Sequence, residues 1–135
     1  MAGYSSTPLW KKLGYADGLR AWLAAAPEHY RPLLGLPANV KVDWLQRPEA
    51  GLKFVHVFAH ESAVLRKQLV ELRRTIAPDG VIWVSWPKKA SRVPTDITED
   101  RIRELALPLG LVDVKVCAVD ETWSGLKLMI RKSER

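Results

Sequence analysis

The chain of 135 residues contains a single cysteine, Cys117. One thiol cannot form a disulfide within the chain, and it cannot supply the cysteine cluster of a structural zinc site. No apolar run is long enough to cross a bilayer, and residues 1–6 have neither the charged start nor the apolar core of a signal peptide. These absences predict a soluble, cytoplasmic protein with no membrane partner.

The short motifs that identify common reactions are also absent. Ser85 has no Gly-x-Ser-x-Gly turn around it, Cys117 has no neighbouring base, and no glycine-rich loop could hold a phosphate. The three histidines form no His-x-x-x-His pair, so His29, His60 and Glu61 could share a metal only if separate loops meet. We therefore predict no catalytic residue, no metal site and no cofactor, and a protein that is non-enzymatic or weakly enzymatic.

What is present is a strand, a helix and a second strand over residues 53–90. The β-branched and aromatic run at 53–59 is too continuous for a strand with one wet face, and it predicts a buried parallel strand in which His56 is a hydrogen-bonded core residue. A helix with four aliphatic side chains on one face follows, and the turn sequence at 78–80 is expected to end it. The second strand, at 81–86, makes this a right-handed crossover in a parallel sheet.

Further elements extend this unit on both sides. They are a helix at 7–14 with Thr7 as its N-cap, a strand at 19–25, a helix from 27 to 35, a half-exposed edge strand at 40–45, a helix from 98 to 110, and an antiparallel hairpin of 111–119 with 126–131. The predicted fold class is α/β, with a three-layer, Rossmann-like mixed sheet that is mostly parallel and has a C-terminal antiparallel hairpin. We expect one domain over residues 1–135.

Residues 13–23 look like the entry to a first strand, and residues 75–84 form a turn before a middle strand. With the closing hairpin, they resemble the S-adenosylmethionine-dependent methyltransferase fold in a truncated form. That resemblance implies a glycine-rich turn after the first strand, because only glycine lets the backbone approach the cofactor closely. Here residues 24–28 read Ala-Ala-Ala-Pro-Glu, and Asp43 alone could be the acid expected at the end of the second strand. We expect the scaffold without its cofactor.

At finer grain, residues 7–14, 85–91 and 109–127 are similar to a family of short bacterial proteins catalogued as a domain of unknown function. The similarity covers nearly the whole chain. This family brings no established activity, so the resemblance implies no catalytic residue.

In open α/β sheets, ligands bind beyond the carboxyl ends of the parallel strands. The loops predicted to lie there carry cations, imidazoles and indoles, and the chain as a whole has 21 Lys and Arg against 15 Asp and Glu, a net charge of +6. The predicted ligand-binding residues are His29, His60, Trp86, Lys88, Lys89, Arg92 and Trp123. They suit a small anion with a flat part, with helix N-termini near His29 and Ser62 as further donors.

Four other interpretations stay open, and one of them is an enzyme of unfamiliar mechanism. The same residues are also what an ordinary basic surface would carry. The domain could bind a protein partner instead of a small anion. The segment from Lys88 to Arg92 beside Trp86 could bind nucleic acid, with affinity that falls steeply as salt rises.

Overall fold

The computed structural model describes residues 7–135, so residues 1–6, on which the signal-peptide prediction depends, lie outside the described part. Six strands form one sheet in the order β2-β1-β3-β4-β6-β5. The strands are β1 (Arg20–Ala24), β2 (Asp43–Leu45), β3 (Leu52–Phe58), β4 (Ile76–Pro87), β5 (Leu111–Ala118) and β6 (Trp123–Ile130). Strands β2, β1, β3 and β4 are parallel, and β6 runs antiparallel to both β4 and β5. The mostly parallel mixed sheet and its C-terminal hairpin are confirmed.

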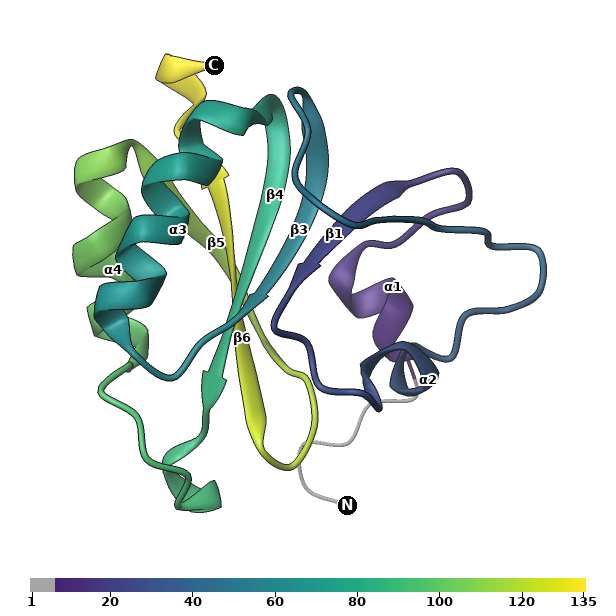
Figure 1. Cartoon of the computed structure of the whole chain (residues 1–135), viewed down its shortest axis with the longest axis horizontal. Coiled ribbons are helices and arrows are strands. Elements are labelled where there is room, and N and C mark those ends of the chain that lie inside the picture. Colours follow the sequence, from purple (N-terminus) through teal and green to yellow (C-terminus); the bar gives the residue numbers. More distant parts are fainter. Residues whose placement is uncertain (1–6) are drawn as a thin grey trace.

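Helices cover both faces of this sheet, as the three-layer prediction requires (Figure 1). The helices are α1 (Leu9–Leu13), α2 (Tyr30–Leu34), α3 (Ser62–Thr75) and α4 (Glu99–Ala106). Figure 1 shows α3 and α4 on one face and α1 and α2 on the other. Helix α3 packs inward through Leu65, Leu69 and Leu72, which recur at the helical period and are buried. No helix within residues 7–135 is long and apolar enough to cross a membrane.

The prediction of a helix-ending turn at residues 78–80 is wrong. Helix α3 ends at Thr75, and β4 begins directly at Ile76 and includes residues 78–80 as an irregularity. Leu52 pairs with Ile76 but Phe54 pairs with Val81, so β4 carries extra residues at this point. A Cβ on Gly80 would lie 3.0 Å from the backbone oxygens of both Ala77 and Leu52. The residues that favour a turn therefore form a bulge, because Gly80 lets two backbone segments approach closely.

Several element ends also differ from the prediction: α2 begins at Tyr30 instead of residue 27, and β6 begins at Trp123 instead of residue 126. Helix α1 starts at Leu9 with Pro8, rather than Thr7, at its N-cap. The edge strand β2 is limited to Asp43–Leu45, and residues 40–42 are not in a strand. Alternating side chains alone could not show where pairing with β1 begins.

Four buried polar side chains form a continuous hydrogen-bonded chain under α1 and α2. The hydroxyls of Tyr15 and Tyr30 are 2.7 Å apart, the Tyr30 hydroxyl is 2.7 Å from His56 Nδ1, and His56 Nε2 is 2.7 Å from Ser85 Oγ. All four are buried, which confirms His56 as a hydrogen-bonded core residue. Burial lowers the pKa of His56 to about 3 and raises the pKa of both tyrosines.

Candidate functional site

The candidate site lies at the carboxyl ends of the parallel strands, along the lower edge of the sheet in Figure 1. Strand β5 is antiparallel to β6, which is antiparallel to β4, so β5 ends at the same edge as β4. The connection from β5 to β6 therefore joins the loops that follow β1, β3 and β4. The backbone N–H of Lys88 donates to the carbonyl of Thr122 at 2.7 Å, which ties the end of β4 to this hairpin.

A cavity of about 450 Å³ opens at this edge, beneath the segment that joins β4 to α4. Three of the predicted residues, Trp86, Lys89 and Arg92, line it together. The rest of the lining comes from Pro87, Val93, Pro94, Thr95, Ile97, Thr98 and Glu99. Half of the lining residues are apolar, and Lys89 and Arg92 add positive charge to the same cavity. Apolar side chains combined with a few polar or charged groups are typical of small-ligand sites.

The charge that faces this cavity is positive. Lys89 and Arg92 are exposed, and neither takes part in an ion pair within residues 7–135. The carboxylate of Glu99 is ion-paired with Arg103. The Thr95 hydroxyl donates to the carbonyl of His60. Lys89 and Arg92 are therefore the charged groups of this lining that no opposite charge engages.

The other four predicted residues lie at the same edge but do not line the cavity. The rings of His60 and Trp123 meet edge to face, with centroids 5.2 Å apart. Lys88 contributes its backbone to the hairpin contact, and His29 Nε2 is 2.8 Å from Asp120 Oδ2. Trp86 and Trp123 are each only 8% exposed, so neither indole offers a free face to solvent.

Asp120 is a site residue that was not predicted. Its Oδ1 accepts hydrogen bonds from the backbone N–H of Thr122 and Trp123, at 2.8 and 2.7 Å, while Oδ2 meets His29. Burial raises the pKa of this carboxyl, but the hydrogen bonds from His29 and from the backbone lower it by more than burial raises it. The pKa of Asp120 therefore lies below its usual value. His29 and Asp120 are 91 positions apart, and no local pattern links them.

The helix N-termini predicted as extra donors are not free to act as such. At the start of α3, the backbone N–H and the hydroxyl of Ser62 donate to the Asp96 carboxylate at 2.7 and 2.8 Å. These two hydrogen bonds, the backbone one first, lower the pKa of Asp96. Helix α2 has five residues, too few to build a helix dipole at His29. An internal carboxylate thus takes the place predicted for a ligand.

The residues after β1 do not fit S-adenosylmethionine in the manner of the methyltransferase fold. Residues 24–28 contain no glycine, and Ala25 has φ of 57°, in the left-handed region that favours glycine. Asp43 is the first residue of β2, not its last, and its carboxylate pairs with Arg20 at the opposite edge of the sheet. The turn that would approach the cofactor therefore carries side chains, and Asp43 is not at the cofactor edge.

Ala25→Gly is expected to stabilise the protein by about 0.5–1 kcal/mol. The left-handed conformation costs a residue with a Cβ about 1–2 kcal/mol, which exceeds the extra chain entropy that glycine loses on folding. Urea denaturation followed by circular dichroism measures the difference. The matched control is Ala24→Gly in the buried strand β1, which should destabilise. Destabilisation of both variants by the same amount would contradict the strain at Ala25.

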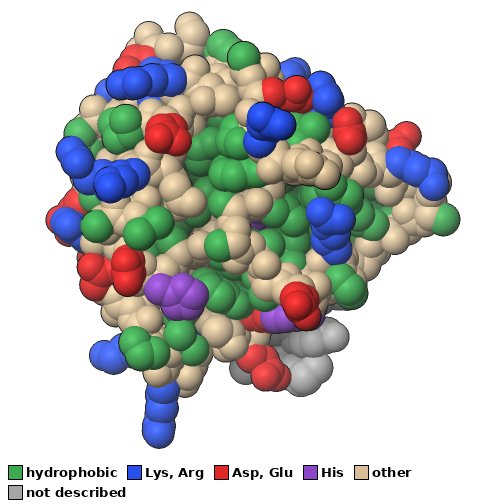
Figure 2. Space-filling model, viewed as in Figure 1, with side chains coloured by type: hydrophobic (Ala, Val, Ile, Leu, Met, Phe, Trp, Pro, Cys, Tyr) green, Lys and Arg blue, Asp and Glu red, His purple; other side chains and the backbone are tan. Residues whose placement is uncertain are grey.

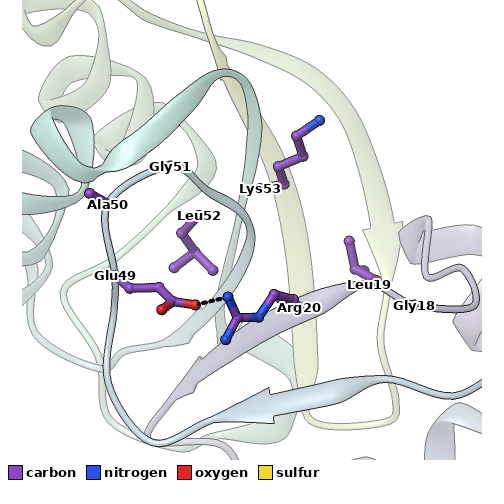
Figure 3. A pocket seen from close by; sticks show the side chains of 8 residues that line it. All are labelled: Gly18, Leu19, Arg20, Glu49, Ala50, Gly51, Leu52 and Lys53. Atoms are coloured by element: carbon purple, nitrogen blue, oxygen red, sulfur yellow. Dashed lines mark ion pairs between the residues drawn. The ribbon is translucent and has the colours of Figure 1, made fainter.

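A second cavity, of about 260 Å³, lies at the amino ends of β1 and β3 (Figure 3). Figure 3 shows Arg20 and Glu49 pointing toward each other across it, and their ion pair measures 2.6 Å. Arg20 also pairs with Asp43 at 3.1 Å, so its charge is neutralised within the chain. Lys53 pairs with Asp79 at 3.6 Å. The charged groups of this cavity are already engaged, and we do not assign it a ligand.

His29, His60 and Glu61 do not form a metal site. Within residues 7–135, no group of three or more His, Cys, Asp or Glu side chains is arranged to hold a metal ion. Cys117 is buried in β5, and burial raises the pKa of its thiol. A raised pKa disfavours the thiolate, which agrees with a structural role for this cysteine.

Comparison with known proteins agrees with this geometry. Residues 54–132, more than half of the chain, match the profile of a family described as "Protein of unknown function (DUF3052)". A SAM-dependent methyltransferase from Aquifex aeolicus superposes with a TM-score of 0.66 and 17% identity, over 89% of this chain and 86% of that one. The O-methyltransferase NcsB1 from neocarzinostatin biosynthesis, in complex with SAM, superposes with a TM-score of 0.65 and 12% identity. The match covers 96% of this chain and 51% of that one. No curated protein sequence matches significantly. At these identities, the methyltransferases establish the shared fold alone.

Proposed function

Because this chain belongs to the family described as "Protein of unknown function (DUF3052)", whose domain here has a methyltransferase-like fold, we propose that it is a ligand-binding rather than a catalytic form of that fold. Its ligand is a small organic anion with a flat apolar part. The observation that supports this proposal is the cavity of about 450 Å³ at the carboxyl edge of the sheet. Lys89 and Arg92 line it together with apolar side chains that include Trp86.

The chemistry of the lining supports an anion. Two cations without an ion-pair partner in residues 7–135 would gain charge-assisted hydrogen bonds from a phosphate or a carboxylate. Proline, valine and isoleucine side chains, together with Trp86, would contact an apolar ring. The alanines at residues 24–26 argue against S-adenosylmethionine as that ligand, since the backbone there carries side chains where the cofactor needs close approach.

Calorimetric titration with phenyl phosphate tests this proposal. Removal of both cations, Lys89→Ala with Arg92→Ala, should weaken binding about 10- to 100-fold, because each charge-assisted hydrogen bond contributes about 1.5–3 kcal/mol and part of it is regained from solvent. The matched control, Lys41→Ala with Arg74→Ala, removes the same charge from exposed positions outside the lining. Equal weakening in both pairs would indicate a general charge effect and refute the site. Saturable binding of S-adenosylmethionine at micromolar affinity would refute the proposal that this chain does not bind that cofactor.

The nucleic-acid interpretation uses the exposed cations Lys89 and Arg92 together with the half-buried Lys88. Base stacking on Trp86 or Trp123 would need ring faces that are buried, because each residue is only 8% exposed. This observation favours the small anion. Titration with a short single-stranded oligonucleotide at 50 and 200 mM salt distinguishes the two, since oligonucleotide binding that fell steeply with salt and exceeded phenyl phosphate binding would favour the nucleic acid.

A further inference from the structure

A third cavity, of about 200 Å³, lies between α3 and the β1 side of the sheet. It is lined by Trp22, Pro48, Gln68, Glu71, Leu72 and Thr75. Helices α3 and α4 cover the middle of this face and its β5 side, while no helix of the described chain lies over β1 and β2 here (Figure 1). Figure 2 shows hydrophobic side chains open to solvent in a hollow beside α3. Parallel strands normally have both faces covered, so this uncovered half is a candidate binding surface.

Gln68 gives the cavity an unsatisfied hydrogen-bond acceptor. Within residues 7–135, its Oε1 is the one buried side-chain nitrogen or oxygen that has no hydrogen-bond partner. A buried polar atom without a partner is costly, and such atoms are rare in folded proteins. The group that would complete this site is therefore a hydrogen-bond donor.

Glu71 adds a negative charge to the same lining. It lies one turn after Gln68 on α3, and within the described chain no ion pair engages its carboxylate, not even with Lys67 or Arg74 on the same helix. The Thr75 hydroxyl already donates to the backbone carbonyl of Glu71 at 2.8 Å. No lysine or arginine of residues 7–135 lines the cavity, so the Glu71 carboxylate is its one charged lining group.

The opposite wall is aromatic and aliphatic. Trp22 is half-buried and packs against the core that contains Leu72. An indole beside a carboxylate attracts a cation through its ring electrons as well as through charge. A cavity of about 150 Å³ is known to be large enough for a benzene ring.

We propose that this cavity binds a small organic ammonium ion with an aromatic or alkyl body. Its N–H groups donate to Gln68 Oε1 and to the Glu71 carboxylate, and its apolar body packs against Trp22 and Leu72. This site is separate from the anion cavity, which is lined by none of these residues. The failure of one proposal would therefore leave the other unaffected.

Titration with 2-phenylethylamine at pH 7, followed by amide shifts in two-dimensional NMR, tests the site. We expect shifts confined to the lining and a Kd on the order of 1 mM, as suits a ligand of this size. Glu71→Gln and Gln68→Met should each weaken binding about tenfold. Glu104→Gln, which removes a carboxylate from the exposed face of α4, is the matched control and should leave the Kd unchanged.

The probe of opposite charge is 3-phenylpropionate, which has a similar size and should not shift the same amides. Equal binding of both probes would show that the cavity responds to apolar surface alone and would overturn the proposal. An unchanged Kd in both Glu71→Gln and Gln68→Met would overturn it as well, as would an absence of shifts at 20-fold the expected Kd. Gln68 is half-buried and Glu71 is exposed, and the same spectra show whether each variant keeps the fold.

Discussion

Lowering the pH from 7 to 4 is expected to reduce the free energy of unfolding by about 3 kcal/mol through His56 alone. Burial holds its pKa at about 3 in the folded protein, against the ordinary value of 6.5 that applies to the unfolded chain. Below pH 6.5 the unfolded chain therefore binds a proton that the folded protein does not. Stability is complete above pH 6.5 and is lost as the pH falls toward 3, at up to about 1.4 kcal/mol for each pH unit.

The pH range of this loss distinguishes the effect of His56 on stability from the effect of the carboxyl groups. Asp96 and Asp120 have pKa values below the usual carboxyl range, so their stabilising effect is lost only as the pH falls further. Urea denaturation at pH 7, 6, 5 and 4 measures the slope, and His56→Gln, which keeps a hydrogen-bonding side chain, should reduce it. NMR titration of the wild-type imidazole is independent of how well the variant folds. A ring signal of His56 that titrates between pH 5 and 7 in the folded protein would contradict the prediction.

Tyr30→Phe is expected to destabilise the protein by about 2–6 kcal/mol. The Tyr30 hydroxyl joins Tyr15 to His56, at 2.7 Å from each, and all three residues are buried. The substitution removes two hydrogen bonds and leaves a polar atom without a partner on either side, each at a cost of about 1–3 kcal/mol. It changes little in volume, so the effect measures the hydroxyl.

The variant Tyr15→Phe measures the coupling between the Tyr15 and Tyr30 hydroxyls when it is compared with Tyr30→Phe. Tyr15 stands at its end, so this variant breaks one bond and should cost about 1 kcal/mol. The double variant should cost less than the sum of the two, since the Tyr15 hydroxyl can no longer be left unpaired. Chemical denaturation of the four proteins at pH 7 gives the coupling energy. Strict additivity would mean that the two hydroxyls do not interact.

Much of the fold could be predicted from local pattern. The continuous apolar run before Phe58 required a buried strand, and Thr98 accepts a hydrogen bond from the Arg101 backbone as the N-cap of α4. The sequence left six residues, 120–125, between the last two predicted strands, and the structure leaves four, 119–122, between β5 and β6. Either connection is too short for a crossover, so the two strands form an antiparallel hairpin. The bulge at residues 77–80 could not be predicted, because glycine and proline favour turns and strand irregularities alike.

The candidate site was only partly within reach of the sequence. Residues 24–28 contain no glycine, and this bears on cofactor binding whatever the tertiary structure is. That Trp86, Lys89 and Arg92 line one cavity could be anticipated, because they are close in sequence at the end of one strand. The role of Asp96 at the start of α3 could not, since Ser62 is 34 positions away.

The sequence by itself determined which chemical groups the protein has and which short segments become strands or helices, because both follow from residue type and from periodicity over a few residues. Only the tertiary structure decided which groups meet. His29 contacts Asp120, Asp43 lies at the amino edge of the sheet, and within residues 7–135 Gln68 Oε1 is left without a hydrogen-bond partner. Each of these outcomes depends on strand order, register and side-chain packing, which bring together residues that no local pattern relates.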